Sequence, residues 1–268
     1  MIILKINNYI KVESLKEAFA LLQSDKKNLI VGGGAWIKQT NKEVETMIDL
    51  EKLNLSTIVE DEKTIKIGAS VTLRQIEVNE TIQHHANGIL VEAISKIMGL
   101  SIRNLATIGG SIMGKYSFSD ILTPLIVMNV DLEFYDSGIV SLAQFMSQKP
   151  LDDILLSIII HKEPLKGYFY TMKKTALDFA VVNVSVTKGE IIKIAIGARP
   201  SISILTEKAM AYINNQSDIS QEVINETARI AIEETKFGTN GRASKEYRES
   251  IAEVYIRRGL KEVTSNES

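Results

Sequence analysis

The sequence predicts an α+β fold in two domains, and three observations support this prediction. The first part of the chain alternates short apolar segments with helix-capping patterns. Two glycine-rich runs interrupt it, each after apolar residues. From about residue 165 the residue pattern changes: long segments typical of antiparallel strands come first, and three segments of helical periodicity follow. A sheet backed by helices that come later in the chain is an α+β arrangement.

The elements of the first domain follow from caps and apolar runs. Ser14 and Glu17 form a Ser-x-x-Glu capping pattern that predicts a helix over 14–24. Thr72 and Gln75 predict a second helix start in the same way. Predicted strands cover 28–31, 46–49, 57–60, 64–68, 130–135 and 154–161, with a hairpin between the third and fourth. Further helices are predicted over 88–98 and 120–128.

The second domain begins where an apolar strand gives way to charge and proline, at His161-Lys162-Glu163-Pro164. Strands are predicted over 181–187 and 190–196, joined by the short loop Lys188-Gly189, which suits a tight hairpin. Helices are then expected at 204–213, 218–235 and 244–262. These assignments give domains at 1–163 and 164–263, with a polar, disordered tail at 264–268.

Composition and charge exclude several classes of partner. The 268 residues carry a formal net charge of −2, and basic residues are scattered among acidic ones. This distribution offers no surface for nucleic acid or anionic lipid. No apolar run is long enough to span a membrane, and the N-terminus lacks a signal-peptide pattern. We therefore expect a cytoplasmic protein with no nucleic-acid or membrane partner.

The chain contains no cysteine and three histidines. Disulfides, thiolate nucleophiles and cysteine-ligated iron–sulfur or zinc sites are therefore excluded, and we expect no metal site in this chain. The sequence shows no Ser/His/Asp array and no obvious pair of catalytic carboxylates. We predict no catalytic side chain, and any redox chemistry would need a bound organic cofactor.

The glycine-rich runs are Val31-Gly32-Gly33-Gly34-Ala35-Trp36 and Thr107-Ile108-Gly109-Gly110-Ser111. Glycine reaches positive φ at little cost, and successive amides in such turns form concavities that suit phosphate. Neither run matches a nucleoside-triphosphate P-loop or the dinucleotide fingerprint of a Rossmann domain. The residues alone allow two interpretations of these runs: two tight turns, or two halves of a clamp for a diphosphate.

Three stretches together resemble a known family: Ile102 to Ile112, the Ser119-Asp120 pair, and Leu177 to Val182. The resemblance is to the FAD-binding medium subunit of molybdenum hydroxylases, the flavoprotein of the xanthine dehydrogenase and carbon monoxide dehydrogenase family. Residues 193–198, Tyr247-Arg248 and Arg257-Arg258 look like the accompanying C-terminal domain. The resemblance implies a two-lobed FAD-binding domain of vanillyl-alcohol oxidase (PCMH) type, followed by a smaller α+β domain with an antiparallel sheet and helices.

The resemblance also implies which residues contact FAD. Backbone amides of the first glycine run meet the diphosphate, and the second run closes on it from the other side. Residues ahead of the second run line the cofactor, and Met113 lies near the flavin. The implied residues of these segments are Leu29, Ile30, Val31, Gly32, Gly33, Gly34, Ala35, Trp36, Ile97, Met98, Ile102, Ala106, Thr107, Gly109, Gly110, Ser111 and Met113.

The remaining implied contacts are Ser119, Asp120, Leu155, Leu156 and Lys174. The alternative role of Ser119-Asp120 is structural, namely helix capping. The alternative role of the two leucines is ordinary core packing. The sequence departs from the family pattern at Ser111, where asparagine is usual, and at Tyr170, where lysine is common. Lys174 is then the expected cationic partner near the cofactor.

By this resemblance the chain is an FAD-binding electron-transfer subunit. Electrons arrive from iron–sulfur clusters of a partner, collect on FAD and leave to NAD or another acceptor. The implied partners are a molybdopterin-binding large subunit and a small iron–sulfur subunit. Two alternatives remain open: a stand-alone FAD reductase of the same superfold, and a non-catalytic subunit that holds flavin or assists assembly.

Overall fold

A computed structural model describes residues 4–37, 41–149 and 151–265, and the chain divides into two compact units. Unit 1 is formed by Met1–Ile76, Gly99–Gly114 and Val130–His161. Unit 2 is formed by Glu77–Met98, Lys115–Asn129 and Lys162–Ser268. Both units are discontinuous, so two segments from the first half of the chain pack with the second half.

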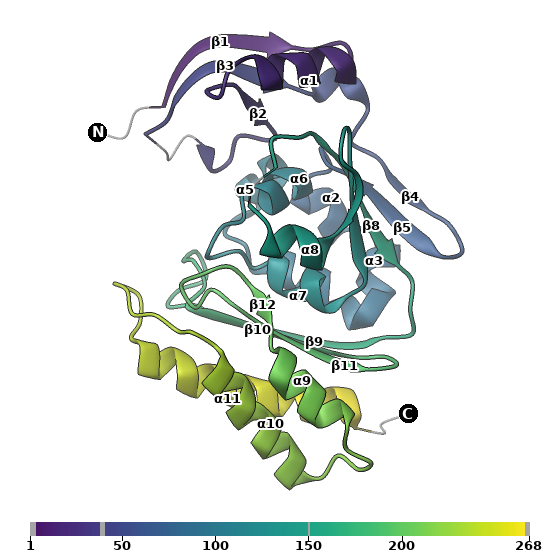
Figure 1. Ribbon diagram of the computed structural model, residues 1–268, viewed down its shortest axis with the longest axis vertical. Helices are drawn as coiled ribbons and strands as arrows, with labels where there is room; N and C mark the ends of the chain where they lie inside the picture. The colour runs from purple at the N-terminus through teal and green to yellow at the C-terminus, as the bar shows by residue number, and fades with distance from the viewer. Residues whose placement is uncertain (1–3, 38–40, 150, 266–268) are drawn as a thin grey trace. The chain divides into compact units, whose positions relative to one another are not determined.

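Unit 1 contains a small parallel sheet with helix α1 (Leu15–Ser24) packed against it (Figure 1). The strand order is β1-β3-β2, with β1 at Lys5–Lys11, β2 at Leu29–Val31 and β3 at Glu43–Asp49. The sequence did not predict β1, because its side chains are mostly exposed and show no apolar alternation. The core of this layer is formed by Val12, Ala18, Ile48, Leu50 and Ile154.

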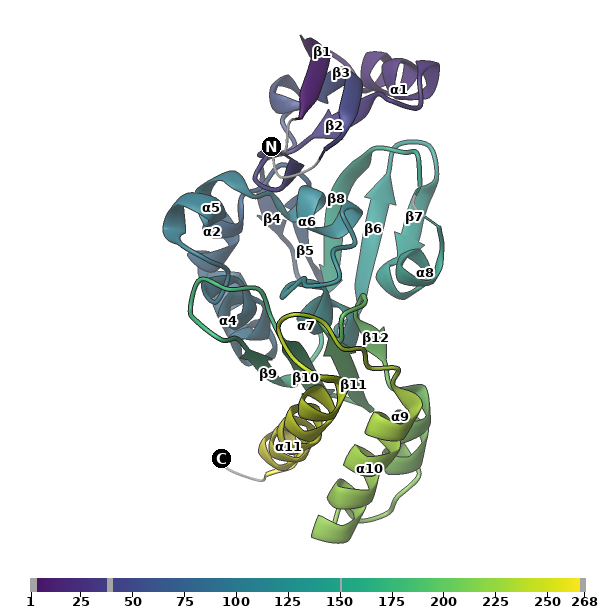
Figure 2. The same cartoon turned by 90° about the vertical axis from the view of Figure 1, so that its left-hand side faces the viewer.

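The second sheet of unit 1 has the strand order β4-β5-β8-β6-β7, and all its pairs are antiparallel (Figure 2). The predicted hairpin of β4 and β5 is confirmed. The strands are β4 (Ile58–Glu60), β5 (Thr64–Gly68), β6 (Val130–Phe134), β7 (Gly138–Ser141) and β8 (Leu155–His161). Short helices accompany them, namely η2 (Glu51–Leu53), α2 (Leu73–Glu77), α5 (Leu100–Leu105), α6 (Ile108–Met113) and α8 (Leu142–Ser147).

Both predicted capping patterns of this part of the chain are confirmed. The Ser14 hydroxyl accepts a hydrogen bond from the Glu17 N–H at the start of α1. At α2 the exchange is reciprocal: the Gln75 N–H donates to the Thr72 hydroxyl, and the Thr72 N–H donates to the Gln75 side chain at 2.8 Å. These bonds satisfy N–H groups that a helix start leaves without partners, which is why the patterns are informative.

Unit 2 is a four-stranded antiparallel sheet covered on both faces (Figure 1). The strand order is β12-β11-β10-β9; α9, α10 and α11 lie on one face, and α4 and α7 pack on the other. The strands are β9 (Lys166–Met172), β10 (Val182–Lys188), β11 (Ile192–Gly197) and β12 (Ile204–Leu205). The helices are α3 (Glu80–His84), η3 (His85–Gly88), α4 (Ile89–Ser95), α7 (Leu122–Val127), α9 (Glu207–Asn214), α10 (Gln221–Glu234) and α11 (Lys245–Thr264).

The C-terminal elements differ from their predicted bounds by one to three residues. Residues 204–205 pair with β11 as β12, so the first of the three late helices begins later than predicted. Helix α11 includes Thr264, whose hydroxyl donates to the Leu260 carbonyl at 2.6 Å, so the predicted disordered tail starts too early. Residues 266–268 of that tail lie outside the described residues.

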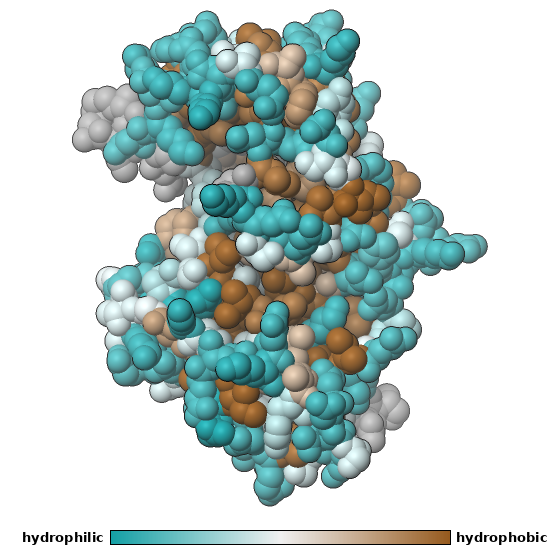
Figure 3. Space-filling model, viewed as in Figure 1, coloured by the Kyte–Doolittle hydropathy of each residue, from teal (hydrophilic) through white to brown (hydrophobic). Residues whose placement is uncertain are grey.

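The sheet of unit 2 explains why α9 to α11 are amphipathic. Their apolar faces join the valines and isoleucines of β10 and β11 in one core. The part of Figure 3 that α9 and α10 occupy is mainly hydrophilic, as expected for their outward faces. In the described part of the chain, no helix is both long enough and apolar enough to cross a membrane.

Strand β10 is buried on both faces although its sequence alternates valine with polar residues. Two of the polar residues bond to the backbone of segment 115–129: Asn183 donates to the Ser119 carbonyl at 2.9 Å, and Thr187 to the Val127 carbonyl at 3.0 Å. Such alternation usually indicates one face in water. Here the polar face anchors a segment that carries two predicted site residues.

Candidate cofactor site

The two glycine runs meet within unit 1, next to the end of β2. A Cβ on Gly33 would lie 1.3 Å from the Leu105 carbonyl oxygen. A Cβ on Gly32 would lie 2.4 Å from the Thr107 hydroxyl oxygen. Contacts this close leave no room for a side chain. Glycine is therefore required at these positions because the backbone of the first run touches the second run.

The second run begins a helix, whereas the sequence suggests a loop. Thr107 is the N-cap of α6, and its hydroxyl accepts from the Gly110 N–H at 3.2 Å. Gly109 lies in the first turn, where a Cβ would meet the Ala69 carbonyl oxygen at 2.7 Å. Gly110 is exposed, and the nearest described atom to a Cβ there is the Thr107 hydroxyl at 3.2 Å. Of these two glycines, Gly109 serves close packing against Ala69.

The amides of the two runs differ in how they are used. In the second run, the N–H groups of Ile108 and Gly109 donate to the Val71 and Ala69 carbonyls, and that of Gly110 to the Thr107 hydroxyl. The Ser111 N–H donates to the Thr107 carbonyl. Among the described residues, the N–H groups of Gly32 to Gly34 donate to no protein acceptor. The first run therefore holds the donors that an anionic group could accept from.

Conformation and exposure of the first run fit that role. Gly34 has φ +67°, a left-handed conformation that glycine adopts readily. Gly32 is exposed, whereas Ala35, which follows the glycines, is buried. Consecutive amides next to a left-handed residue form the kind of concavity that binds phosphate. The residues present thus fit a diphosphate-bearing cofactor at the first run.

Removal of the α6 cap tests the local architecture. Replacing Thr107 by valine keeps the shape but loses the acceptor for the Gly110 N–H, and we expect a loss of about 1 kcal/mol in the free energy of unfolding. Urea denaturation measures it, with Ser24→Ala as a control, because that exposed hydroxyl donates to the last turn of α1. Equal stability of the two variants would contradict the capping role.

The other predicted residues of unit 1 are placed as follows. Leu29, Ile30 and Val31 form β2, and Ala106 is buried with its carbonyl accepting from Leu73 N–H. The Ser111 hydroxyl is buried and donates to the Thr107 carbonyl at 2.8 Å, so it points into the protein. Trp36, Ile102 and Met113 are half-buried, as are the three residues of β2.

The paired leucines of β8 have different surroundings. Leu156 packs against the core cluster beneath α1, which supports the core-packing interpretation for this residue. Leu155 is buried as well, with its backbone in register with Phe134 of β6. Within unit 1, both side chains therefore contribute to packing.

The remaining predicted residues belong to unit 2. Ile97 is buried, and Met98 is half-buried with φ +33°. The Ser119 hydroxyl accepts from the N–H of Leu122, the first residue of α7, at 3.3 Å, although the N-cap position of this helix is Ile121. The Ser119 carbonyl accepts from Asn183, which ties the turn before α7 to β10.

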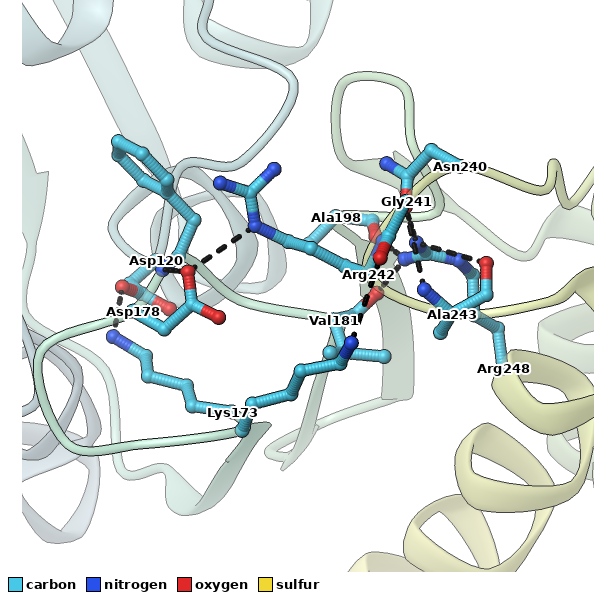
Figure 4. A network of polar contacts seen from close by, with 12 residues as sticks. Asp120, Lys173, Asp178, Val181, Ala198, Asn240, Gly241, Arg242, Ala243 and Arg248 are labelled. Carbon is cyan, nitrogen blue, oxygen red and sulfur yellow. Dashed lines mark hydrogen bonds and ion pairs between the residues drawn. The ribbon is translucent and has the colours of Figure 1, made fainter.

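Asp120 forms a buried ion pair with Lys173 (Figure 4). The Lys173 Nζ lies 2.7 Å from Asp120 Oδ2, and the Thr171 hydroxyl donates to Oδ1 at 3.1 Å. Lys173 also donates to the Lys96 carbonyl at 2.6 Å. Burial raises the pKa of the Asp120 carboxyl, whereas Lys173 and the other donors favour the charged form. The pair joins the segment before α7 to the end of β9.

Lys173, rather than its neighbour Lys174, is thus the partner of Asp120. Lys174 is exposed, and its Nζ lies 3.5 Å from the Gly241 carbonyl oxygen. The alternation of side chains along a strand could have predicted the pairing of Lys173 with Asp120, because Thr171 and Lys173 lie two residues apart and face the same side. Tyr170 faces the other side, where its ring stacks on Tyr255 of α11 with centroids 3.3 Å apart. Tyr170 therefore belongs to the core under α11.

The comparisons with known proteins cover both halves of the chain. Residues 4–163 match the family model described as FAD binding domain in molybdopterin dehydrogenase. The chain belongs to this family. Residues 167–263 match the CO dehydrogenase flavoprotein C-terminal domain. The cofactor of the chain is FAD. The family consists of FAD-containing oxidoreductase subunits of xanthine and carbon monoxide dehydrogenase type.

Named relatives agree with this membership. The xanthine dehydrogenase FAD-binding subunit of Escherichia coli O157:H7 is 28% identical over 135 residues, which cover 48% of this chain and 46% of that protein. The chain thus spans less than half the length of this relative. The glyceraldehyde dehydrogenase medium chain of Sulfolobus acidocaldarius is 24% identical over 279 residues, covering 96% of this chain and 98% of that protein.

Solved structures show the same fold. A carbon monoxide dehydrogenase from Hydrogenophaga pseudoflava contains a chain that matches with a TM-score of 0.88 and 21% sequence identity, covering 98% of both chains. Quinoline 2-oxidoreductase from Pseudomonas putida 86 matches with a TM-score of 0.83 at 20% identity, covering 96% of each chain. At this identity the likeness establishes the fold.

Proposed function

We propose that this chain is the electron-transfer subunit of a molybdenum hydroxylase complex. It receives electrons from iron–sulfur clusters of a partner and passes them through FAD to NAD or another acceptor. The proposed partners are a molybdopterin-binding large subunit and a small iron–sulfur subunit. Family membership supports this role, as does the absence of cysteine, which leaves the chain without ligands for an iron–sulfur cluster of its own.

The observation that carries the proposal is the set of unused donors at the first glycine run. In the proposed complex with FAD, the N–H groups of Gly32, Gly33 and Gly34 hold diphosphate oxygens, which are strong charge-bearing acceptors. The Thr107 side chain and the Leu105 carbonyl lie against Gly32 and Gly33 and so position that run. Bound FAD supplies the one- and two-electron chemistry, and the protein supplies position and exclusion of water.

The proposal extends to the architecture of the FAD-binding region. We assign residues 1–163 to a domain of PCMH type and residues 164–263 to a C-terminal α+β domain, as the family resemblance implies. Five residues of unit 2 stay predicted contacts of the cofactor, namely Ile97, Met98, Ser119, Asp120 and Lys174. The buried pair with Lys173 fixes the position of Asp120 within unit 2.

Visible absorption of the purified chain tests the cofactor role. After incubation with FAD and removal of free flavin, we expect flavin bands to stay with the protein, followed by bleaching with NADH if NAD is the acceptor. Flavin bands without bleaching would exclude nicotinamide coupling by the isolated chain. A chain that cannot be reconstituted with FAD would contradict the proposed function.

Copurification tests the complex. A tagged chain expressed in its native host and extracted gently is expected to bring down chains that carry molybdopterin and iron–sulfur centres, detected by metal analysis. A flavin-loaded chain that reduces an acceptor alone and brings down neither partner would favour the stand-alone reductase instead. A chain that binds partners but no flavin would favour the assembly role.

A further inference from the structure

Unit 2 contains a pocket of about 290 Å³ at the N-terminus of α11. We call it the Arg242 pocket. It lies between the segment that follows β9 and the segment that precedes α11, and none of the glycines of the cofactor site lines it. The residues that line it are Met172, Lys173, Lys174, Val181, Arg242, Ala243 and Tyr247.

The three basic side chains of this pocket are not equally neutralised. Lys173 is paired with Asp120, and Arg242 with Asp178 at 3.2 Å (Figure 4). Lys174 forms no ion pair with any described residue, and its contact is the long one to the Gly241 carbonyl. Two cationic groups of the pocket, those of Lys174 and Arg242, therefore share one nearby carboxylate, that of Asp178.

A further positive charge, that of Arg248, lies behind the wall of the pocket. Arg248 is 1% exposed, and its guanidinium donates to the carbonyls of Val181, Ala198 and Ala243 and to the Asn240 side chain (Figure 4). Its Nε has no hydrogen-bond partner among the described atoms. Val181 and Ala243, whose carbonyls accept from Arg248, both line the pocket.

This arrangement leaves positive charge at the pocket without a matching carboxylate. Burial lowers the pKa of Arg248, and repulsion by Arg242 lowers it further. A buried charge that lacks a counter-ion is costly, whereas an anion near it recovers part of that cost. The first turn of the 20-residue helix α11, capped by Ser244, adds to the positive potential, and Glu246 of that turn is exposed to solvent.

The walls and the size of the pocket indicate the rest of the ligand. Met172, Val181 and the ring of Tyr247 offer apolar surface beside the charges. The volume lies at the lower end of the range of about 300–1,000 Å³ for small-molecule sites. We propose that the Arg242 pocket binds a small organic monocarboxylate, with its carboxylate on Lys174 and Arg242 and its apolar body against Val181 and Tyr247. This site goes beyond the proposed electron transfer, and it assigns Lys174 to a ligand other than FAD, which the displacement experiment below tests.

Calorimetric titration of the full chain with benzoate tests the proposal. We expect benzoate to bind, and benzamide, which has the same shape without the charge, to bind at least about tenfold more weakly. Lys174→Gln should weaken benzoate binding by about tenfold or more, while Lys174→Arg keeps it within about threefold. Lys245→Gln is the matched control. Lys245 lies in the first turn of α11, as Tyr247 does, but does not line the pocket.

Four results would overturn the proposal. The first is that benzoate does not bind, and the second is that benzamide binds equally well. The third is that inorganic phosphate binds more tightly than benzoate. The fourth is that FAD displaces benzoate, which would show that the pocket belongs to the cofactor site. Circular dichroism checks that each variant is folded. Flavin content is measured on the same samples, so loss of FAD binding with intact benzoate binding would contradict the proposed function and leave this inference standing.

Discussion

Replacing Lys173 by methionine is expected to lower the free energy of unfolding by about 3–5 kcal/mol, because it leaves the Asp120 carboxylate buried without its partner. Both side chains of the pair are less than one-tenth exposed, so solvent cannot replace the lost ammonium. Thr171 and Asn183 would still donate to the carboxylate, but they carry no charge. Urea denaturation followed by circular dichroism measures the effect.

The neighbouring lysine is the matched control for this variant. Lys174→Met removes the same chemical group from an exposed position and is expected to cost less than about 0.5 kcal/mol. The double variant Asp120→Asn with Lys173→Met should be more stable than Lys173→Met alone, since it removes the unpaired charge. If the two single lysine variants are equally stable, the buried pair does not stabilise unit 2.

Replacing Gly33 by alanine is expected to abolish FAD retention and to cost about 3 kcal/mol or more, as overpacking at a rigid contact does. The new Cβ would lie 1.3 Å from the Leu105 carbonyl oxygen, and that atom belongs to the backbone of α5. The two runs must then separate, which displaces the amides that hold the diphosphate. Flavin absorbance after gel filtration and urea denaturation measure the two effects.

Gly99→Ala is the control, because nothing lies within 4 Å of its new Cβ. We expect this variant to cost less than about 1 kcal/mol. Retention of FAD by Gly33→Ala at the level of the unchanged chain would remove the first run from the diphosphate site. Equal losses in both variants would show that the contact with Leu105 does not decide the outcome.

Local features of this chain were predictable because their causes lie within a few residues. The caps at Ser14 and Thr72 exchange hydrogen bonds over three residues, and the hairpin of β4 and β5 turns on Asp61. Strand β1 was missed because its stability comes from pairing with β3 rather than from its own pattern. Helix α6 was missed because paired glycines lack helix propensity, and its first turn depends on the Thr107 cap.

The sequence by itself determined the candidate residues for flavin binding, two glycine runs and a Ser-Asp pair, and it excluded a cysteine-ligated iron–sulfur cluster from this chain. Only the tertiary structure decided which amides of those runs remain available, because Ala69, Val71 and Thr107 accept from those of the second run. It also decided that Lys173 neutralises Asp120 and that Arg248 is buried without a carboxylate. Such pairings join residues far apart in the chain, so they depend on which surfaces the topology buries together, and no local pattern records that.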